Sequence, residues 1–149
     1  MSLTFDPADL DAEDIGEETA ILHMEHEAAI EHVREAFTDA GFGVATEFSP
    51  SELLNEKVDA GRDPYYVLGA CNPKMADWAL SASENKIGAL FPCNVVIWEE
   101  KPGVQQVYHI SIMRAARLLG MAPDNDEWDE LVGETGKLVE KAFANLDSE

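Results

Sequence analysis

The sequence predicts an α+β fold, a two-layer α/β sandwich in which a mixed sheet of about five strands carries helices packed on one face. Three observations lead to this class. Short segments rich in β-branched and aromatic residues alternate with segments whose apolar residues recur at helical spacing. A turn at residues 101–103 joins two of the strands into a hairpin. A long amphipathic helix ends the chain, and its apolar face must cover the sheet or a partner.

The elements of the first half follow from spacing and from residues that begin or end helices. Gly41 is expected to end the first helix, and Ser49 with Pro50 opens the second, because Pro suits the first helical turn. The predicted elements are a strand at 19–24, a helix at 29–40, a strand at 43–48 and a short helix from 50. Residues 1–18 carry seven carboxylates and no basic residue. We therefore expect an acidic N-terminal tail at 1–18 and one domain at 19–149.

The second half repeats the alternation and ends in the long helix. Asn72 is a preferred N-cap and Pro73 fits the first helical position, so a helix begins there. The last helix has apolar residues at the 3, 4, 7 spacing. The predicted elements are a strand at 65–70, a helix at 73–82, a strand at 95–98, a strand at 107–111 and a helix at 128–146.

Composition and charge limit the classes of function. Thirty acidic residues against ten basic ones give a formal net charge of −20, spread over helix faces and loops. This pattern indicates adaptation to high salt. The alternatives are an ordinary acidic protein with a solvated face and a charge-driven function such as binding a basic partner. Nucleic-acid binding is disfavoured, because it requires Lys and Arg to neutralise phosphates.

Cysteine usage and hydropathy predict a cytoplasmic protein. The two cysteines are 22 positions apart, and no charged and apolar signal sequence is visible at the N-terminus, which fits thiols in a reducing cytosol. The apolar stretches are too short to span a bilayer, so no membrane partner is expected.

Three segments carry a resemblance to a known family. They are 41–44 (GFGV), 68–76 (LGACNPKMA) and 87–96 (IGALFPCNVV). Together they resemble the DUF302 family, also called TT1751-like, over roughly residues 20–112. The resemblance implies a compact α+β domain, often dimeric, of no established biochemical activity. Many relatives carry an Asp-Pro pair where this chain has Ser111-Ile112, so a role tied to that carboxylate is not carried over.

Both cysteines lie at junctions between a predicted strand and its connection, in Cys71-Asn72-Pro73 and Pro92-Cys93-Asn94. A helix N-terminus favours a thiolate, so Cys71 is a candidate nucleophile, persulfide carrier or redox sensor. The alternative is a buried core thiol, with Asn72 and Pro73 serving as a cap. Cys93 precedes an apolar strand and fits the core interpretation better.

The start of the strand after the third helix decides whether the two thiols meet. If that strand begins at Cys93, we expect it to start roughly 15–20 Å from Cys71, too far to pair. If it begins near Ile87, with Pro92 at a bulge or edge, Cys93 could approach Cys71. A disulfide would require Cα atoms about 4.4–6.8 Å apart.

The histidines suggest a rival site. His23 and His26, with Glu25 or His109, have the nitrogen and oxygen atoms that bind zinc or copper. Their spacing matches no known metal motif, so no metal is predicted and the alternative is exposed or hydrogen-bonded histidines. No nucleophile elbow is visible, and hydrolase chemistry is not supported.

Two functional classes remain. The first is a small-molecule binding or sensor module, with a pocket between sheet and helices in which Cys71, Asn72 and Cys93 are ligand-binding candidates. Its expected aromatic lining is Tyr65, Tyr66, Trp78, Phe91 and Trp98. The alternative is a thiol-dependent enzyme or sulfur/redox carrier using Cys71. The ligand and any cofactor are left unassigned. The expected partners are a small molecule and a second copy of the chain, the latter through the apolar face of residues 128–146.

Overall fold

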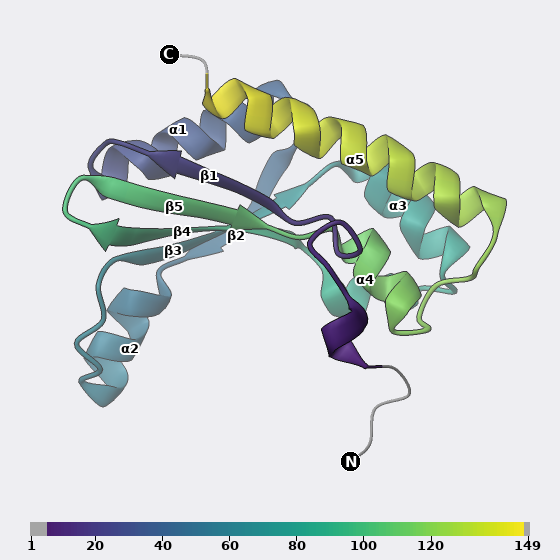
Figure 1. Ribbon diagram of the computed structural model, residues 1–149, viewed down its shortest axis with the longest axis horizontal. Coiled ribbons are helices and arrows are strands. Elements are labelled where there is room, and N and C mark those ends of the chain that lie inside the picture. Colours follow the sequence, from purple (N-terminus) through teal and green to yellow (C-terminus); the bar gives the residue numbers. More distant parts are fainter. Residues whose placement is uncertain (1–5, 148–149) are drawn as a thin grey trace.

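In the computed structural model, which describes residues 6–147, five strands form one sheet in the order β1-β5-β4-β3-β2 (Figure 1). The strands are β1 (Glu18–Leu22), β2 (Gly43–Phe48), β3 (Tyr65–Cys71), β4 (Cys93–Lys101) and β5 (Val104–His109). The predicted α+β class and its five strands are confirmed. The expected mixture of strand directions is wrong, because every neighbouring pair is antiparallel. Strands β2 to β5 follow one another as a meander, and β1 joins the sheet beside β5.

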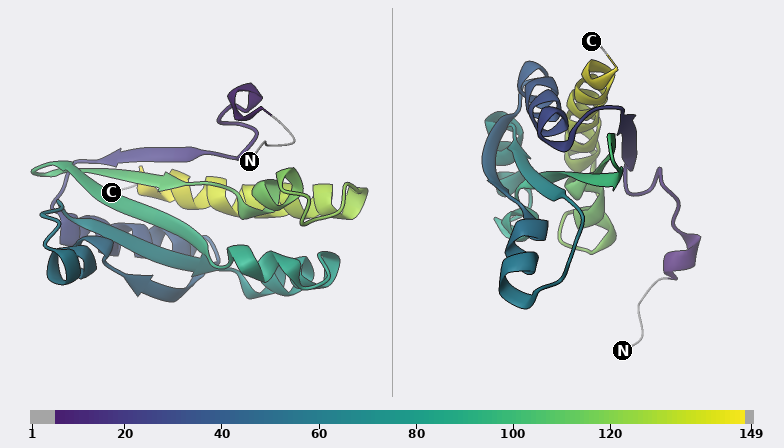
Figure 2. Two further views of the ribbon diagram at one scale, coloured as in Figure 1. Left: turned by 90° about the horizontal axis from the view of Figure 1, so that it is seen from below. Right: turned by 90° about the vertical axis from the view of Figure 1, so that its left-hand side faces the viewer.

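Two helices form the second layer, and the others lie around the sheet. Figure 2 shows α1 (His26–Asp39) and α5 (Asp126–Leu146) side by side on one face. Two more helices, α3 (Pro73–Ala82) and α4 (Ile112–Leu118), pack against the N-terminal half of α5 beyond the sheet end. The helix α2 (Pro50–Val58) lies on the opposite face, so the expectation of helices on one face fails there. The remaining helical segments are the 3-10 helices η1 (Pro7–Asp9) and η2 (Lys86–Leu90).

The apolar face of α5 is buried within its own chain. Its C-terminal half contributes Phe143 and Leu146 to the core between α1 and the sheet, where Phe37 and Ile97 are also buried. Its N-terminal half contributes Trp128 to a second cluster with α3 and α4. The prediction that this helix covers a sheet face is confirmed. The suggestion that the same face could join a second copy is wrong, because these side chains are already covered.

Capping residues place the helices that frame the sheet end. Asn72 and Ser49 cap α3 and α2 through their side chains, each followed by Pro, as predicted. Ser111 caps α4 by accepting a hydrogen bond from the Arg114 amide. The sequence interpretation missed α4, because it continued the last strand to Ser111, whereas β5 ends at His109.

The segment before β1 contacts the domain. The Ser111 amide donates a 2.8 Å hydrogen bond to the Ile15 carbonyl, and the Tyr108 hydroxyl donates to Glu17 at 3.1 Å. Gly16 between them has φ +61, and a Cβ there would lie 2.8 Å from the Ser111 Cβ. Residues 15–17 are therefore docked, although they fall within the predicted tail. The first five residues of that tail lie outside the described residues.

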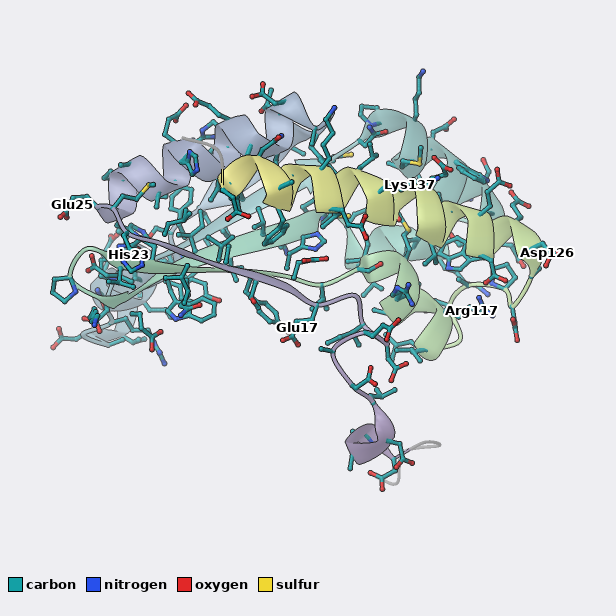
Figure 3. All side chains as sticks on the ribbon, turned by 45° about the horizontal axis from the view of Figure 1, so that its top comes forward. Glu17, His23, Glu25, Arg117, Asp126 and Lys137 are labelled. Carbon is teal, nitrogen blue, oxygen red and sulfur yellow. The ribbon has the colours of Figure 1, made fainter. Side chains whose placement is uncertain are left out.

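The acidic residues are distributed over the whole exterior. Figure 3 shows Glu17, Glu25 and Asp126 on well-separated parts of the molecule. Arg34 pairs with Glu31 and Glu47, and Arg117 pairs with Asp124 and Asp129. Between residues 6 and 147, none of the helices combines the length and the apolar character needed to span a membrane.

Candidate functional site

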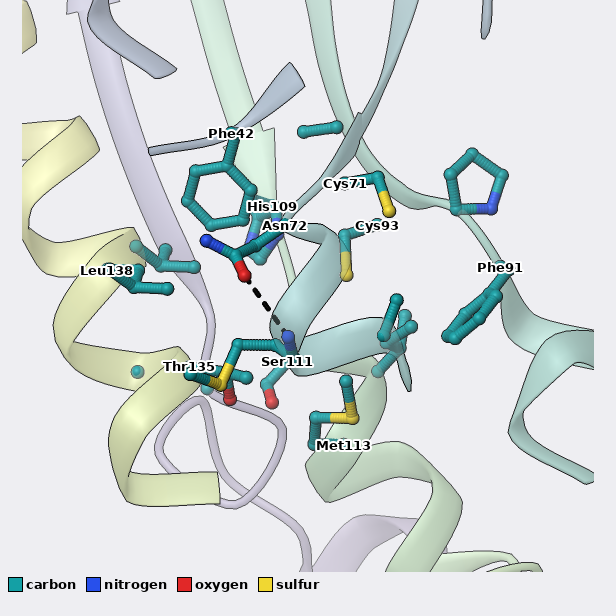
Figure 4. A pocket seen from close by; sticks show the side chains of 18 of the residues that line it. Phe42, Cys71, Asn72, Phe91, Cys93, His109, Ser111, Met113, Thr135 and Leu138 are labelled. Atoms are coloured by element: carbon teal, nitrogen blue, oxygen red, sulfur yellow. Dashed lines mark hydrogen bonds between the residues drawn. The ribbon is translucent and has the colours of Figure 1, made fainter. Parts of the chain in front are cut away.

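A cavity of about 340 Å³ lies at the end of the sheet, between β3, β4 and β5 and the helices α3, α4 and α5 (Figure 4). Its volume is in the range of small-molecule sites, about 300–1,000 Å³. The apolar lining includes Phe42, Met75, Phe91, Met113, Val132, Leu138 and Val139. The polar lining includes Glu18, Thr46, Cys71, Asn72, Cys93, His109, Ser111, Arg114 and Thr135.

Antiparallel pairing of β3 and β4 brings both cysteines to this cavity. Ala70 lies opposite Cys93 in the register, so the end of β3 adjoins the start of β4. The strand does begin at Cys93, and Ile87 lies in η2. The wide separation expected for that case is wrong, because it holds for parallel strands, in which the start of β4 lies beside the start of β3 and far from Cys71, whereas β3 and β4 are antiparallel. Both thiols are free and half-buried, and Figure 4 shows them near each other.

The environment of Cys93 makes it a poor nucleophile. Burial, and to a lesser extent the neighbouring Cys71, raise the pKa of Cys93 to about 12. This thiol is therefore protonated at neutral pH, whereas the thiolate is the reactive form. Cys71 directly precedes the N-cap of α3. Among the described residues, no side chain is hydrogen-bonded to it to serve as a base.

Asn72 joins two walls of the cavity. Its Oδ1 accepts a hydrogen bond from the Met75 amide at 3.1 Å, and its Nδ2 donates to the Gly41 carbonyl at 3.0 Å. Gly41 has φ +103, a backbone conformation that favours glycine. The side chain thus fixes the start of α3 against the turn that follows α1. Asn72 is a structural cap in this position, and its Oδ1 has lone-pair capacity left for a ligand.

Close backbone packing shapes the cavity beside β3. A Cβ on Gly69 would lie 2.4 Å from the Thr46 Oγ1 and 2.5 Å from the Pro92 Cγ. Thr46 and Pro92 both line the cavity. Gly69 is needed for these two residues to approach each other across β3.

His109 is the most unusual residue of the cavity. Its side chain lies among the rings of Phe37 and Phe143, with centroids 6.1 and 6.3 Å away, and only 2% of the residue is exposed. Neither ring nitrogen has a hydrogen-bond partner among the described residues. Burial lowers the pKa of His109 to about 4, so the imidazole is neutral at pH 7. Buried polar atoms in proteins are nearly always paired, so this pair of free nitrogens requires an explanation.

His109 lies apart from the histidines with which the sequence pattern groups it. His26 Nδ1 is hydrogen-bonded to Gln105 Oε1 at 2.8 Å, at the far end of β5 from His109. Within residues 6–147, no three His, Cys, Asp or Glu side chains are grouped so that they could hold a metal ion. The usable signal was the alternation Gln105, Val107, His109, which places His109 on the same face of β5 as buried Val107.

Most of the aromatic residues expected in the pocket lie elsewhere. Tyr65 and Trp98 stack at 5.9 Å on the opposite face of the sheet, because they alternate with the core residues of β3 and β4. Tyr66 donates to Glu47 at 2.6 Å, and Trp78 donates to Glu127 at 3.0 Å. Phe91 does line the cavity. The aromatic lining is therefore corrected to a mainly aliphatic and sulfur-containing one.

The charged groups of the cavity are few. Glu18 lies directly opposite His109 in the β1–β5 pair. Burial, and then the neighbouring Glu140, raise the pKa of Glu18. Among the described residues that line the cavity, Arg114 is the one Lys or Arg, and it is exposed. The interior thus combines an apolar wall with several neutral hydrogen-bonding groups and the carboxyl group of Glu18.

The fold and the cavity together define the class of the protein, an α+β domain with a mainly apolar cavity at the end of its sheet. Residues 18–146 match the family profile described as "Domain of unknown function DUF302", so the chain belongs to that family. The resemblance seen in the sequence is confirmed.

A solved structure shares the fold. The crystal structure of an uncharacterized conserved DUF302 protein from Bacillus stearothermophilus is similar, with a TM-score of 0.74 and 22% sequence identity. The likeness covers 87% of this chain and 96% of that one. At this identity it establishes the fold alone. No curated protein matches the chain.

Proposed function

We propose that the protein is a small-molecule binding or sensor module and that the cavity beside His109 is its ligand site. The observation that carries this proposal is the pair of unpartnered ring nitrogens on a buried side chain that lines the cavity. A bound molecule with a hydrogen-bonding group would satisfy one of them. The mainly apolar lining would bury the rest of the ligand.

Glycines of α5 allow a test that fills the cavity without disturbing its polar groups. Gly136 lines the cavity, and a Cβ added to it would meet no atom within 4 Å. The Gly136→Phe substitution therefore places a ring in the space that a ligand would occupy. Gly133 is exposed on the same helix, lies outside the lining and is equally free of contacts. Gly133→Phe is the matched control.

The experiment is a fragment screen by amide NMR in molar KCl, using neutral, cationic and anionic fragments. The proposal predicts fragments that shift the amides of lining residues in the wild type and in Gly133→Phe, but not in Gly136→Phe. A screen in which no fragment shifts these amides, or in which Gly136→Phe responds like the wild type, would contradict it.

A thiol-dependent enzyme or sulfur/redox carrier using Cys71 is the second candidate. Its support is the position of Cys71, which lines the same cavity as His109 and directly precedes the N-cap of α3. Cys71→Ser separates the two candidates, since the binding module keeps its ligand response and the thiol function loses all turnover or sulfur transfer. Enzymatic activity as such remains unassigned.

We also propose that the protein works in the cytoplasm, at high salt, and as a homodimer. The free thiols and the charge of −20 support the first two. For the dimer, the apolar face of α5 is not available, but Phe48 at the end of β2 and Leu53, Leu54 and Val58 in the adjoining α2 are exposed. Light scattering in molar KCl that detects monomer alone would remove the dimer.

A further inference from the structure

We propose that the cavity takes a neutral aromatic hydroxyl compound of the phenol class, whose hydroxyl group hydrogen-bonds to His109. The inference rests on the proposed function and narrows it to one ligand chemistry. Three properties of the cavity support it: the hydrogen-bonding capacity of His109, the sign of the charges nearby, and the sulfur atoms in the wall.

The imidazole of His109 selects the polar group of the ligand. A neutral imidazole has one N–H donor and one nitrogen acceptor, and the two tautomers exchange these roles. A hydroxyl group can donate to one nitrogen or accept from the other, so it matches either tautomer. A carboxylate can only accept, and an ammonium group can only donate. Neither nitrogen is engaged within the described protein, and both are covered by neighbouring atoms. A hydroxyl therefore satisfies one of these unpaired atoms when the imidazole or a lining side chain turns to admit it.

The carboxyl groups around His109 disfavour an anionic ligand, and any charged ligand loses its hydration in a mainly apolar cavity. Glu18 lies opposite His109, with Glu140 close enough to raise the pKa of Glu18 further. An anion in the cavity would meet this carboxyl group, while the neutral imidazole supplies no positive charge. Arg114 is exposed, so it does not provide a desolvated partner for an anion. A neutral ligand avoids these costs.

The wall of the cavity favours an aromatic ring. Four sulfur-containing side chains from different elements line it: Cys71, Cys93, Met75 and Met113. Sulfur atoms make favourable contacts with aromatic rings, and Met side chains adapt to the shape of a ligand. Phe42 and Phe91 supply ring contacts as well. A volume of about 340 Å³ leaves room for a substituted benzene ring.

The test uses three probes that differ in one group: 4-methylphenol, toluene and 4-methylbenzoate. Dissociation constants are measured from the amide shifts of lining residues in molar KCl. We expect 4-methylphenol to bind at least about tenfold more tightly than toluene, since one hydrogen bond to a buried acceptor is gained, and 4-methylbenzoate to bind most weakly. In His109→Phe, the tenfold preference for 4-methylphenol over toluene should disappear.

Thr135→Val is the matched control within the cavity. Thr135 also lines it, but its hydroxyl already hydrogen-bonds to the Leu131 carbonyl at 2.9 Å. This variant should keep the preference for 4-methylphenol. If His109→Phe does not fold, His109→Gln, which retains a donor and an acceptor, should keep part of the preference.

The outcomes separate this inference from the proposed function. If toluene binds as tightly as 4-methylphenol, or if 4-methylbenzoate binds best, the phenol class is overturned. The proposal that the cavity is a ligand site would still stand in both cases. If none of the three probes binds but a fragment from the screen still shifts the lining amides, the phenol class is again overturned and the ligand site is kept. Failure of the probes together with every fragment would contradict both proposals.

Discussion

Glu18 and His109 face each other across the antiparallel β1–β5 pair and both line the cavity, yet neither ring nitrogen of His109 has a hydrogen-bond partner in residues 6–147. Burial raises the pKa of Glu18 and lowers the pKa of His109, so both shifts favour the uncharged form. A neutral imidazole thus lies beside a carboxyl group at the polar end of a mainly apolar cavity.

Replacing His109 should not weaken the ligand-free protein. His109→Phe removes two unpaired buried polar atoms and places a ring among Phe37 and Phe143, with the cavity available for the added volume. We expect the free energy of unfolding to stay level or to rise by about 1 kcal/mol. Urea denaturation in molar KCl measures it. A loss of more than about 2 kcal/mol would show that His109 has a stabilising partner.

Acid should destabilise the protein through His109. Its pKa falls from 6.5 to about 4 on folding, so the unfolded chain binds a proton more readily. Stability is therefore lost as pH falls below 6.5, down to about pH 4. One such group contributes roughly 3 kcal/mol over this range, at about 1.4 kcal/mol per pKa unit.

The His109→Phe variant isolates that contribution, because carboxylates such as Glu18 titrate in both proteins. The difference in unfolding free energy between pH 7 and pH 5 should be about 2 kcal/mol larger in the wild type. Equal pH dependence in the two proteins would mean that His109 is charged in the folded state or is not buried.

The two thiols should react at different rates. Because the pKa of Cys93 is raised to about 12, very little of it is thiolate at pH 7, and iodoacetamide should label Cys71 first. Mass spectrometry of timed samples identifies the labelled peptide, and the urea-unfolded protein, in which both should react alike, is the control. Faster labelling of Cys93 would contradict the arrangement described. Equal protection of both would argue against a thiol function for Cys71.

Salt should stabilise the protein strongly. The net charge of −20 is spread over the exterior, so screening by KCl weakens carboxylate repulsion. We expect the Tm to rise by about 10 °C or more between 0.1 M and molar KCl, which corresponds to a few kcal/mol. Calorimetry with sucrose in place of KCl is the control for non-ionic effects. A Tm independent of KCl would refute adaptation to high salt.

The elements of the fold could be predicted because their signals are local. Asn72-Pro73 and Ser49-Pro50 mark helix starts, and the apolar spacing of 128–146 marks a buried face. The antiparallel pair of β4 and β5 follows from the predicted hairpin turn and is confirmed. The directions of the other strands are set by pairing between distant segments, which local patterns do not record. The helix α4 was missed because its N-cap, Ser111, follows a strand without a turn residue.

Part of the candidate site could be predicted, because some of its residues also carry local signals. Cys71, Asn72 and Cys93 stand at element ends, which is a local feature of the sequence, and strand pairing brings those ends to the cavity. Tyr65 and Trp78 were chosen for their ring type, but strand alternation and the contact with Glu127 place them outside the cavity lining. His109 stands out because its two ring nitrogens have no hydrogen-bond partner among the described residues. No sequence pattern shows which partners a buried side chain has.

The most direct test of the central claim is the ¹⁵N NMR spectrum of the His109 imidazole at pH 7, with and without 4-methylphenol. We predict a neutral ring whose nitrogen resonances move as the probe is added, with the same saturation as the amides that line the cavity. Ring resonances that stay unchanged while 4-methylphenol saturates those amides, or a ring that is already charged in the free protein, would contradict the account.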